Sequence, residues 1–307
     1  MIAPDARPPK VVVFGSLNND QVLRVPRAPG AGETLSAHSF ATHPGGKGAN
    51  QAVACARQGA EVVMAGRVGV DAFGATLREG LARDGIDARR VVTTPGQPTG
   101  VALIMVDDAA QNRIVVVPGA NGAVDRADAE ALRDELATAR LLMMQCEVPM
   151  QAVQRAAEVA RDAGCRVVLN PAPARPLPDA LWPCVDLLIV NESEAALLCG
   201  SPVDDIESAG RAARALRARG PAQVFLTMGA SGVVVADAHG EHHHPALPVQ
   251  AVDTTAAGDT FAGALCAALV RGEAMDAALQ RAIRAAATCV TRHGAQTSIP
   301  RRDEAVS

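Results

Sequence analysis

The sequence predicts a three-layer α/β/α sandwich with a mostly parallel central sheet and a second, smaller β-sheet. Two observations predict the sandwich: short apolar runs alternate with helical patterns, and 49% of the 307 residues are hydrophobic, which is enough for one large core. The smaller sheet is predicted because two segments, about 20–44 and 99–117, interrupt this alternation with extended, turn-rich sequence. We therefore expect one domain over residues 1–307, with both segments inserted in it.

The strands of the main sheet are predicted from short runs dominated by apolar residues, such as KVVVF and LLMMQ. Such runs are typical of parallel strands that are covered by helices on both faces. We expect strands at residues 10–14, 61–66, 141–145, 166–169, 186–190 and 223–227. Helical patterns are expected at residues 49–58, 73–84, 127–139, 150–163, 192–199 and 206–219.

The two inserted segments look extended. Residues 20–44 are divided by prolines and glycines, and residues 99–117 look like a hairpin, TGVALIMV–DDAAQN–RIVVV. Both alternating faces of residues 101–106 are apolar, whereas a strand in a one-sided sheet has one polar face. We therefore expect this strand to be covered on both sides, by the main body and, in one alternative, by another subunit.

Composition and charge argue against several function classes. A net charge of −4 and 2% aromatic residues, with no Tyr, predict neither a nucleic-acid surface nor attraction to an anionic membrane. The longest apolar run, residues 261–270, is half a membrane span, and the first ten residues hold no signal-peptide core. The seven cysteines are scattered without a CxxC pair, so we interpret them as reduced, buried side chains of a cytoplasmic protein.

The stretch DTTAAGDTFAGAL, residues 253–265, places a carboxylate directly after a turn of small residues, at a predicted helix start. Ala256, Ala257 and Gly258 let a ligand approach the backbone, and the helix points free N–H groups and its positive dipole end at that ligand. This predicts an anion site suited to phosphate. Asp259 fits such a site as the general base for a hydroxyl that attacks phosphorus. An ordinary helix start, in which Asp259 only complements the dipole, explains the same residues equally well.

A second glycine-rich turn, HPGGKGANQA at residues 43–52, also opens a predicted helix. Its spacing matches neither GxGxxG nor GxxxxGK[ST], so it is neither a Rossmann nor a Walker motif. Gly45 and Gly46 allow close backbone approach. Lys47 and Asn50 add groups that can hydrogen-bond to polyol hydroxyls. Alone, this turn is a weak signal for a sugar site.

Other polar or glycine-rich loops also follow predicted strands. GSLNND, residues 15–20, places Asn18 and Asp20 on one side of an extended backbone. Glu147 follows LLMMQ, NESE follows DLLIV, and TMGASG, residues 227–232, begins as another strand ends. Because the carboxyl ends of parallel strands meet at one edge of a sheet, this convergence predicts a ligand cleft there. Plainer interpretations remain, an Asx turn for GSLNND and helix capping for NESE.

Together these motifs resemble the ribokinase-like (PfkB) family of carbohydrate kinases. The resemblance runs from Val11 to about Pro300, with GSLNND, GGKGANQA, PTGVALI, LNPAPAR, NESEA and VDTTAAGDTFAGAL in the expected order. GGKGAN and DTTAAGDTFAGAL are the two signatures of the family, and LNPAPAR and PTGVALI point to its ribose kinases. The resemblance implies ATP-dependent phosphorylation of D-ribose to D-ribose 5-phosphate, with Mg²⁺ accompanying ATP.

The resemblance also implies roles for individual residues. Asp259 would be the catalytic base, residues 256–258 the anion hole, and Glu194 a residue linked to magnesium and phosphate. Residues 20–44 and 99–117 would form a β lid over the sugar, through which two subunits pair as a homodimer. The implied sugar contacts are Asn18, Asp20, Gly46, Lys47, Gly48, Asn50, Glu147 and Asp259. The implied ATP contacts are Asn191, Thr227, Gly229, Ser231, Gly232, Ala257 and Gly258.

A potassium site that activates the enzyme is implied in the same way. Asp253 lies six residues before Asp259, too far along the turn to share its task. The ion would fix the turn at residues 255–258 before charge develops on the phosphate. A plainer interpretation is that Asp253 only caps the turn. The implied ligands, all oxygen atoms as a hard cation requires, are Asp253, the carbonyls of Thr255, Cys289, Arg292 and Gly294, and the Ser298 hydroxyl.

Two other functions are consistent with the sequence: a kinase for another sugar or a nucleoside, and a sugar- or nucleotide-binding regulator without catalysis. A purine nucleoside favours aromatic stacking, which five Phe and one Trp supply poorly. A regulator needs no base at Asp259. The sequence departs from the family pattern at Asn19, Ala262 and Ile283, and Ile283 leaves the contact with adenine open.

Overall fold

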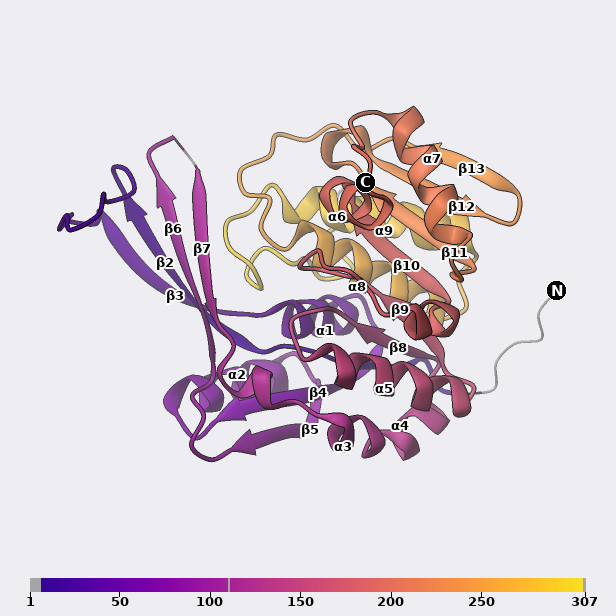
Figure 1. The fold of residues 1–307 in the computed structure, drawn as a ribbon, viewed down its shortest axis with the longest axis horizontal. Helices are drawn as coiled ribbons and strands as arrows, with labels where there is room; N and C mark the ends of the chain where they lie inside the picture. The colour runs from indigo at the N-terminus through magenta and orange to yellow at the C-terminus, as the bar shows by residue number, and fades with distance from the viewer. Residues whose placement is uncertain (1–6, 110, 306–307) are drawn as a thin grey trace.

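The computed structural model describes residues 7–109 and 111–305, and within them the strands form a nine-stranded and a four-stranded sheet. The order of the large sheet is β13-β12-β11-β10-β9-β8-β1-β4-β5. The pairs β11–β12 and β12–β13 are antiparallel, and the other pairs are parallel. Helices surround the large sheet, and the small sheet projects from one side (Figure 1). The predicted fold class is therefore confirmed.

Most strands of the large sheet lie where apolar runs predict them, within three residues at each end. The prediction omits β5, β12 and β13. Of these, β5 and β13 are the edge strands, and their sequences, DARRVVTT and GEHHH, are too polar to resemble a buried strand. The strands are β1 (Lys10–Phe14), β4 (Glu61–Gly69), β5 (Asp87–Thr94), β8 (Leu141–Met144), β9 (Arg166–Leu169), β10 (Leu187–Asn191), β11 (Gln223–Thr227), β12 (Val233–Asp237) and β13 (Gly240–His244).

Two hydrophobic cores lie on the two faces of the large sheet. One core includes side chains of α3 to α7, and the other includes side chains of α1, α2, α8 and α9. The helices are α1 (Lys47–Arg57), α2 (Ala72–Arg83), α3 (Arg126–Glu130), α4 (Arg133–Thr138), α5 (Met150–Asp162), α6 (Glu192–Cys199), α7 (Ile206–Arg217), α8 (Ala257–Val270) and α9 (Met275–Cys289). Short 3₁₀ helices occur at η1 (Gly119–Ala123), η2 (Asp179–Cys184) and η3 (Gly229–Ser231).

The single helix predicted over residues 127–139 is wrong, because the chain forms two short helices there, α3 and α4. Leu132 N–H donates to Ala129 O at 3.2 Å, which is the tighter bond of a 3₁₀ turn. Ala129, Leu132 and Leu136 all enter the same core, as residues at this spacing also would in an unbroken helix. Their burial therefore does not explain the break, and no proline or glycine lies at it.

The small sheet has the order β3-β2-β6-β7 and contains both inserted segments. Its strands are β2 (Asn18–Val25), β3 (Ser39–Gly45), β6 (Gly100–Asp107) and β7 (Asn112–Val117). The predicted hairpin is confirmed as β6 and β7, and Ala110 of its turn lies outside the described residues. The expected cover on both sides is wrong for the single chain, because only Ala102 of residues 101–106 is buried. The reason is that the small sheet extends away from the main body (Figure 1).

All seven cysteines are free, and all but Cys199 are buried, as the apolar stretches around most of them predict. Across residues 7–109 and 111–305, the helices are too short or too polar to cross a membrane. The proposed absence of a signal peptide concerns residues 1–10, of which 1–6 lie outside the described part of the chain.

Candidate active site

The loops predicted to bind ligand meet at the carboxyl ends of the parallel strands. β1 lies between β4 and β8 in the sheet. After β1 the chain adds β4 and β5 on one side of it, and it then continues with β8 and β9 on the other side. Open α/β sheets bind ligands at such a point, where the strand order reverses. Ser16 follows β1, Glu147 follows β8, and Ser16 Oγ donates to Glu147 Oε2 at 2.5 Å. Lys47 N, at the start of α1, donates to the same oxygen at 3.0 Å. Three predicted loops are thus joined at Glu147.

Asp259 lies in the first turn of α8 and is only 6% exposed. Its Oδ2 accepts a hydrogen bond from Asn50 Nδ2 at 3.1 Å, and its Oδ1 accepts one from Gln51 Nε2 at 2.9 Å. Both donors belong to α1, so the two glycine-rich turns of the sequence face each other. The side-chain contacts therefore support the prediction that DTTAAGD and GGKGAN belong to one site.

The turn before α8 has an unusual backbone. Ala256 has a φ of 61° and a ψ of 9°, and it is the one non-glycine residue with positive φ in the described part of the chain. This left-handed conformation costs about 1 kcal/mol for an L-residue and persists where the surroundings impose it, often at functional sites. Ala257 N donates to Thr254 O at 3.2 Å, so one amide of the predicted anion hole also stabilises the turn.

The glycines of GGKGAN serve mainly to pack the protein against itself. A Cβ atom on Gly46 would lie 2.7 Å from Asn18 N, and one on Gly48 would lie 2.6 Å from Ser16 N. Gly46 also has a φ of 86°, which favours glycine. Their small size is needed where α1 meets the loop after β1, which is a packing requirement apart from the expected close approach of a ligand at Gly46. Gly258 is the opposite case, since no heavy atom lies within 4 Å of its Cβ position.

Asn18 and Asp20 lie on β2, with exposures of 3% and 8%, and the sheet register places both side chains on the same face. Asn121, in η1, orients Asn18: Asn121 Nδ2 donates to Asn18 Oδ1 at 2.7 Å and to Leu17 O at 3.0 Å. Leu17 N in turn donates to Asn121 Oδ1 at 3.0 Å. The end of the small sheet that carries Asn18 is thus fixed to the main body at the site.

The site contains more buried negative than positive charge. Burial, together with the nearby carboxylates of Glu147 and Asp259, raises the pKa of Asp20 to about 7 against the opposing effect of Lys47. The pKa of Lys47 is raised chiefly by Asp259, despite burial. Burial likewise raises the pKa of Glu194. Lys47 thus stays protonated at neutral pH amid these acids, and such a site suits a ligand that brings hydrogen-bond donors or a cation.

The predicted nucleotide residues occupy the neighbouring strands. Asn191 ends β10 and caps α6, because its Oδ1 accepts from Glu194 N at 2.8 Å while Glu194 Oε2 accepts from Asn191 N at 3.0 Å. The capping interpretation of NESE is therefore confirmed, and a role in binding nucleotide would be additional. Thr227 ends β11 beside Asn191, η3 follows, and Gly232 has a φ of 98°.

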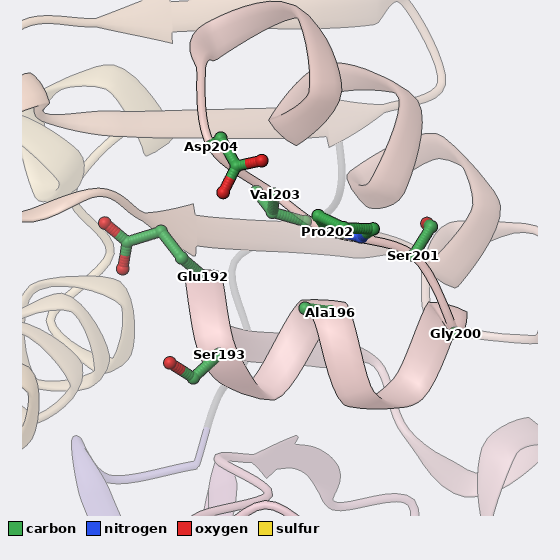
Figure 2. A pocket seen from close by; sticks show the side chains of 8 residues that line it. All are labelled: Glu192, Ser193, Ala196, Gly200, Ser201, Pro202, Val203 and Asp204. Carbon is green, nitrogen blue, oxygen red and sulfur yellow. The ribbon is translucent and has the colours of Figure 1, made fainter.

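A surface hollow of about 460 Å³ lies on the side of α6 that faces the loop to α7 (Figure 2). Glu192, Ser193 and Ala196 line it from α6, and residues 200–204 line it from the loop. The hollow adjoins Asn191 and Glu194 in sequence, but none of the predicted sugar or ATP residues lines it. It is therefore a neighbour of the candidate site and lies outside its chemistry.

The predicted cation ligands come together from two segments, 253–255 and 289–298. Asp253 accepts from Thr255 N and from Gly294 N, each at 2.9 Å. Burial acts to raise the pKa of Asp253, but these hydrogen bonds outweigh it, so that the pKa is lowered. The Cys289 thiol lies 3.6 Å from Thr255 O and 3.1 Å from Ser298 Oγ. Residues 7–109 and 111–305 hold no cluster of three or more His, Cys, Asp or Glu able to bind a metal, so a cation here would depend on backbone oxygens.

Sequence reasoning did not select four polar residues that organise the site: Ser16, Gln51, Asn121 and Asn170. Ser16, Gln51 and Asn170 lie inside the motifs GSLNND, GGKGANQA and LNPAPAR, but the sequence alone assigned them no role. Burial of a polar side chain marks such residues, but it is invisible before the fold is known. Asn121 belongs to none of these motifs, and its role follows only from its contacts with Leu17 and Asn18.

A family model described as pfkB family carbohydrate kinase matches residues 8–302. The chain belongs to this family. The ribokinase of Haemophilus influenzae is 41% identical over 294 residues, which are 96% of each protein. The ribokinase of Schizosaccharomyces pombe is 41% identical over 301 residues, 94% of each. A solved structure of Arabidopsis thaliana ribokinase, complexed with ribose and ATP, has a TM-score of 0.91 and 33% identity, and the match covers 97% of both chains. The resemblance to carbohydrate kinases is thereby confirmed.

Proposed function

We propose that this pfkB family kinase transfers the γ-phosphoryl group of ATP to the 5-hydroxyl of D-ribose, giving D-ribose 5-phosphate and ADP. The observation that carries the proposal is the contact of Asp259 with Asn50 and Gln51 of α1, which brings the carboxylate that we propose as general base next to the GGKGAN turn. Relatives 41% identical over nearly their whole length are ribokinases, which favours ribose among sugars.

In the proposed mechanism, Asp259 accepts the proton of the 5-hydroxyl as its oxygen attacks the γ-phosphorus and the bond to the β-phosphate oxygen breaks. The amides at the start of α8 stabilise the charge that develops on the transferred phosphoryl group. The sugar is held by Asn18, Asp20, Gly46, Lys47, Gly48, Asn50 and Glu147. The nucleotide is held by Asn191, Thr227, Gly229, Ser231, Gly232, Ala257 and Gly258.

Mg²⁺ would accompany ATP, where it neutralises phosphate charge. Glu194 fits a role near it, because this buried carboxylate lies among Asn170, Asn191 and the start of α6, at the same edge of the sheet. The excess of buried carboxylates around Lys47 also suits a site that receives a cation with its substrate.

A potassium ion is proposed between residues 253–255 and 289–298. The oxygen-rich donor set fits: the Asp253 carboxylate, the carbonyls of Thr255, Cys289, Arg292 and Gly294, and the Ser298 hydroxyl. Asp253 already bridges the two segments through Thr255 N and Gly294 N. An ion held there would stiffen the turn that contains Ala256 and would touch no substrate.

The small sheet is proposed to act as a lid over the sugar and as a dimer interface. Asn18 and Asp20 share a face with Ala102, whereas Leu23, Leu103 and Val115 share the opposite face. Six of the eleven large apolar side chains that are exposed in the described part of the chain belong to this sheet: Phe40, Leu103, Ile114, Val115, Val116 and Val117. Four of them, Phe40, Leu103, Val115 and Val117, lie on the face opposite Asn18 and Asp20, and a second copy of the chain would cover this face. Seven free cysteines fit a reducing compartment, and we place the protein in the cytoplasm.

A coupled assay of ADP release with a panel of D-ribose, 2-deoxy-D-ribose, D-fructose and adenosine tests the proposal. We expect the highest kcat/KM with D-ribose and phosphorylation at the 5-hydroxyl, checked by NMR of the product. A higher kcat/KM with another sugar or with adenosine would transfer the proposal to that substrate. Ribose binding without ADP release would instead identify a regulator that lacks catalysis.

A further inference from the structure

Beneath the proposed base lies a group of three buried or half-buried side-chain amides that the mechanism above does not use. Gln51 and Gln145 are each 0% exposed, and Asn170 is half-buried. Gln51 Nε2 lies 2.9 Å from Asp259 Oδ1 and 3.0 Å from Asn170 Oδ1. Gln145 Nε2 lies 2.6 Å from Gln51 Oε1. The three amides come from α1 and from the ends of β8 and β9, so the group joins three elements below Asp259.

The carboxylates at the two ends of this group fix the direction of its hydrogen bonds. A carboxylate only accepts, so Gln51 turns its NH₂ group toward Asp259, and its oxygen is left to accept from Gln145. Asn170 accepts from Gln51 through Oδ1 and donates through Nδ2 to Glu194 Oε2 at 3.3 Å. Reversing any of these amides would place like groups face to face. The amides therefore have a single arrangement, and it connects Asp259 with Glu194.

Close packing of α1 against α8 brings Gln51 within ordinary hydrogen-bond distance of Asp259. A Cβ atom on Gly263 would clash with the Ala54 side chain and would lie 3.0 Å from Gln51 O. Gly263 thus brings the two helix backbones together one turn beyond Asp259. Gln51 is held between two packed helices, and its position is as fixed as theirs.

We propose that Gln51 is a positioning residue that holds the Asp259 carboxylate for proton transfer and, through Asn170, couples it to Glu194; this rests on the proposed function. Asn50 also donates to Asp259, but the proposed function assigns Asn50 to the sugar, whose hydroxyls compete for its amide. Gln51 has no such second task, because it is fully buried. It keeps Oδ1 fixed throughout turnover and leaves Oδ2 for the reacting hydroxyl.

The first test compares Gln51→Met with Gln58→Met. Both remove a buried glutamine amide, and Gln58 lies at the opposite end of α1, where its Nε2 donates to Pro300 O at 3.0 Å. We expect Gln51→Met to lower kcat about 10- to 100-fold, the loss that misplacement of a reacting group by about 1 Å causes, with KM for ribose and ATP within about threefold of wild type. Gln58→Met should lower the Tm and leave kcat within about threefold. Equal kcat values for the two variants would overturn the proposal.

The second test places Gln51→Met in an Asp259→Asn background. A residue that acts only through Asp259 loses its effect when the base is absent, so the added loss in kcat should be less than about threefold. The same loss in both backgrounds would overturn the positioning role. If Gln51→Met does not fold, Gln51→Asn, which withdraws the amide by one methylene, is measured in its place. Should wild type prefer another sugar, the proposed substrate fails, and the Gln51 variants are compared with that sugar instead.

Discussion

Asp259 is the side chain whose substitution most directly tests the proposed chemistry. Asp259→Asn preserves size and removes proton acceptance. We expect turnover to fall by about 10²–10⁴, the usual contribution of a positioned general base. Ribose affinity, measured by calorimetry, should fall less than turnover, because the other sugar contacts are intact. A variant that retains turnover close to wild type would exclude Asp259 as the base.

Asp20 couples sugar binding to pH and to stability. Burial, Glu147 and Asp259 raise its pKa in the folded, sugar-free protein from 3.8 to about 7. A raised folded-state pKa means that the folded protein binds the proton more tightly than the unfolded chain between about pH 4 and pH 7. The stability associated with this proton is present below pH 4 and is lost as the pH rises through 7. Asp20 is therefore most destabilising when it is ionised.

We therefore expect Asp20→Asn to raise the Tm of the sugar-free protein at pH 8, by an amount equivalent to a few kcal/mol at most, and to change it little at about pH 4, where the unfolded chain begins to bind the same proton. The same variant should weaken ribose binding about 10- to 100-fold, because hydrogen bonds to a charged acceptor are lost. Thermal unfolding at both pH values and calorimetric titration with ribose measure the two effects. A Tm at pH 8 equal to or below that of wild type would contradict the assigned cost of burying Asp20.

Among the elements, the start of α8 allows a substitution that is expected to impair catalysis without destabilising the fold. Gly258 lies in the first turn of α8, where a Cβ atom would contact no atom of the protein. Replacing a helical glycine with alanine stabilises the fold by about 0.5–1 kcal/mol where the backbone allows it. We expect Gly258→Ala to keep or raise the Tm while lowering kcat/KM for ATP at least tenfold, because its methyl group occupies the space proposed for phosphate.

Gly80→Ala is the matched control, since Gly80 lies within α2 and a Cβ atom there would meet only the end of the Arg83 side chain, at 3.6 Å. This variant should raise the Tm by a similar amount and leave kinetics unchanged. Unaltered kcat/KM in Gly258→Ala would mean that no ligand approaches the start of α8.

The turn before α8 is the element on which the proposed potassium ion acts. At constant ionic strength, we expect K⁺ to raise the activity of wild type severalfold above that with Na⁺ or a bulky organic cation. Asp253→Ala should remove the difference, because Asp253 supplies the charge of the proposed site and joins Thr255 to Gly294. Equal wild-type rates in all three salts would refute the cation site and leave Asp253 as a cap of the turn.

Individual elements were predictable where the pattern of apolar residues in the sequence matches the faces that are buried in the structure. KVVVF and DLLIV predict β1 and β10 because both faces of a central parallel strand are buried. The edge strand β5 was not predicted, because DARRVVTT is polar on its exposed face. The split into α3 and α4 could not be foreseen, because Ala129, Leu132 and Leu136 have the spacing of one continuous helix face and no proline or glycine marks the break.

At the scale of the whole molecule, the exposed apolar face of the small sheet predicts the oligomeric state. Leu103→Asp places a charge in this face, and we expect the dimer seen by light scattering at micromolar concentration to become a monomer with a raised KM for ribose. Leu197→Asp on α6 is the control, because Leu197 is 46% exposed compared with 39% for Leu103 and lies outside the small sheet. A monomeric wild type would refute the proposed interface.

The motifs of the candidate site could be predicted from the sequence, but the buried side chains that support these motifs could not. Asp259, Lys47 and Asn50 stand out in the sequence because a carboxylate and amide or ammonium groups follow small-residue turns. Their mutual approach depends on the packing of α1 against α8, which no local pattern encodes. For the same reason the supporting amides, such as Gln51 and Asn121, appear only when distant segments are brought together.

The side chains of Asn50 and Asp259 meet across 209 residues of sequence, and this separation orders events in time. During translation, α8 therefore leaves the ribosome long after α1. Until α8 arrives, Asn50 and Gln51 lack the carboxylate to which they donate, and burying an unpartnered amide is unfavourable. Docking of α1 is therefore completed only after α8 has been made. Phosphorylating activity would not appear before that point, and a nascent chain without α8 would have no partially active stage.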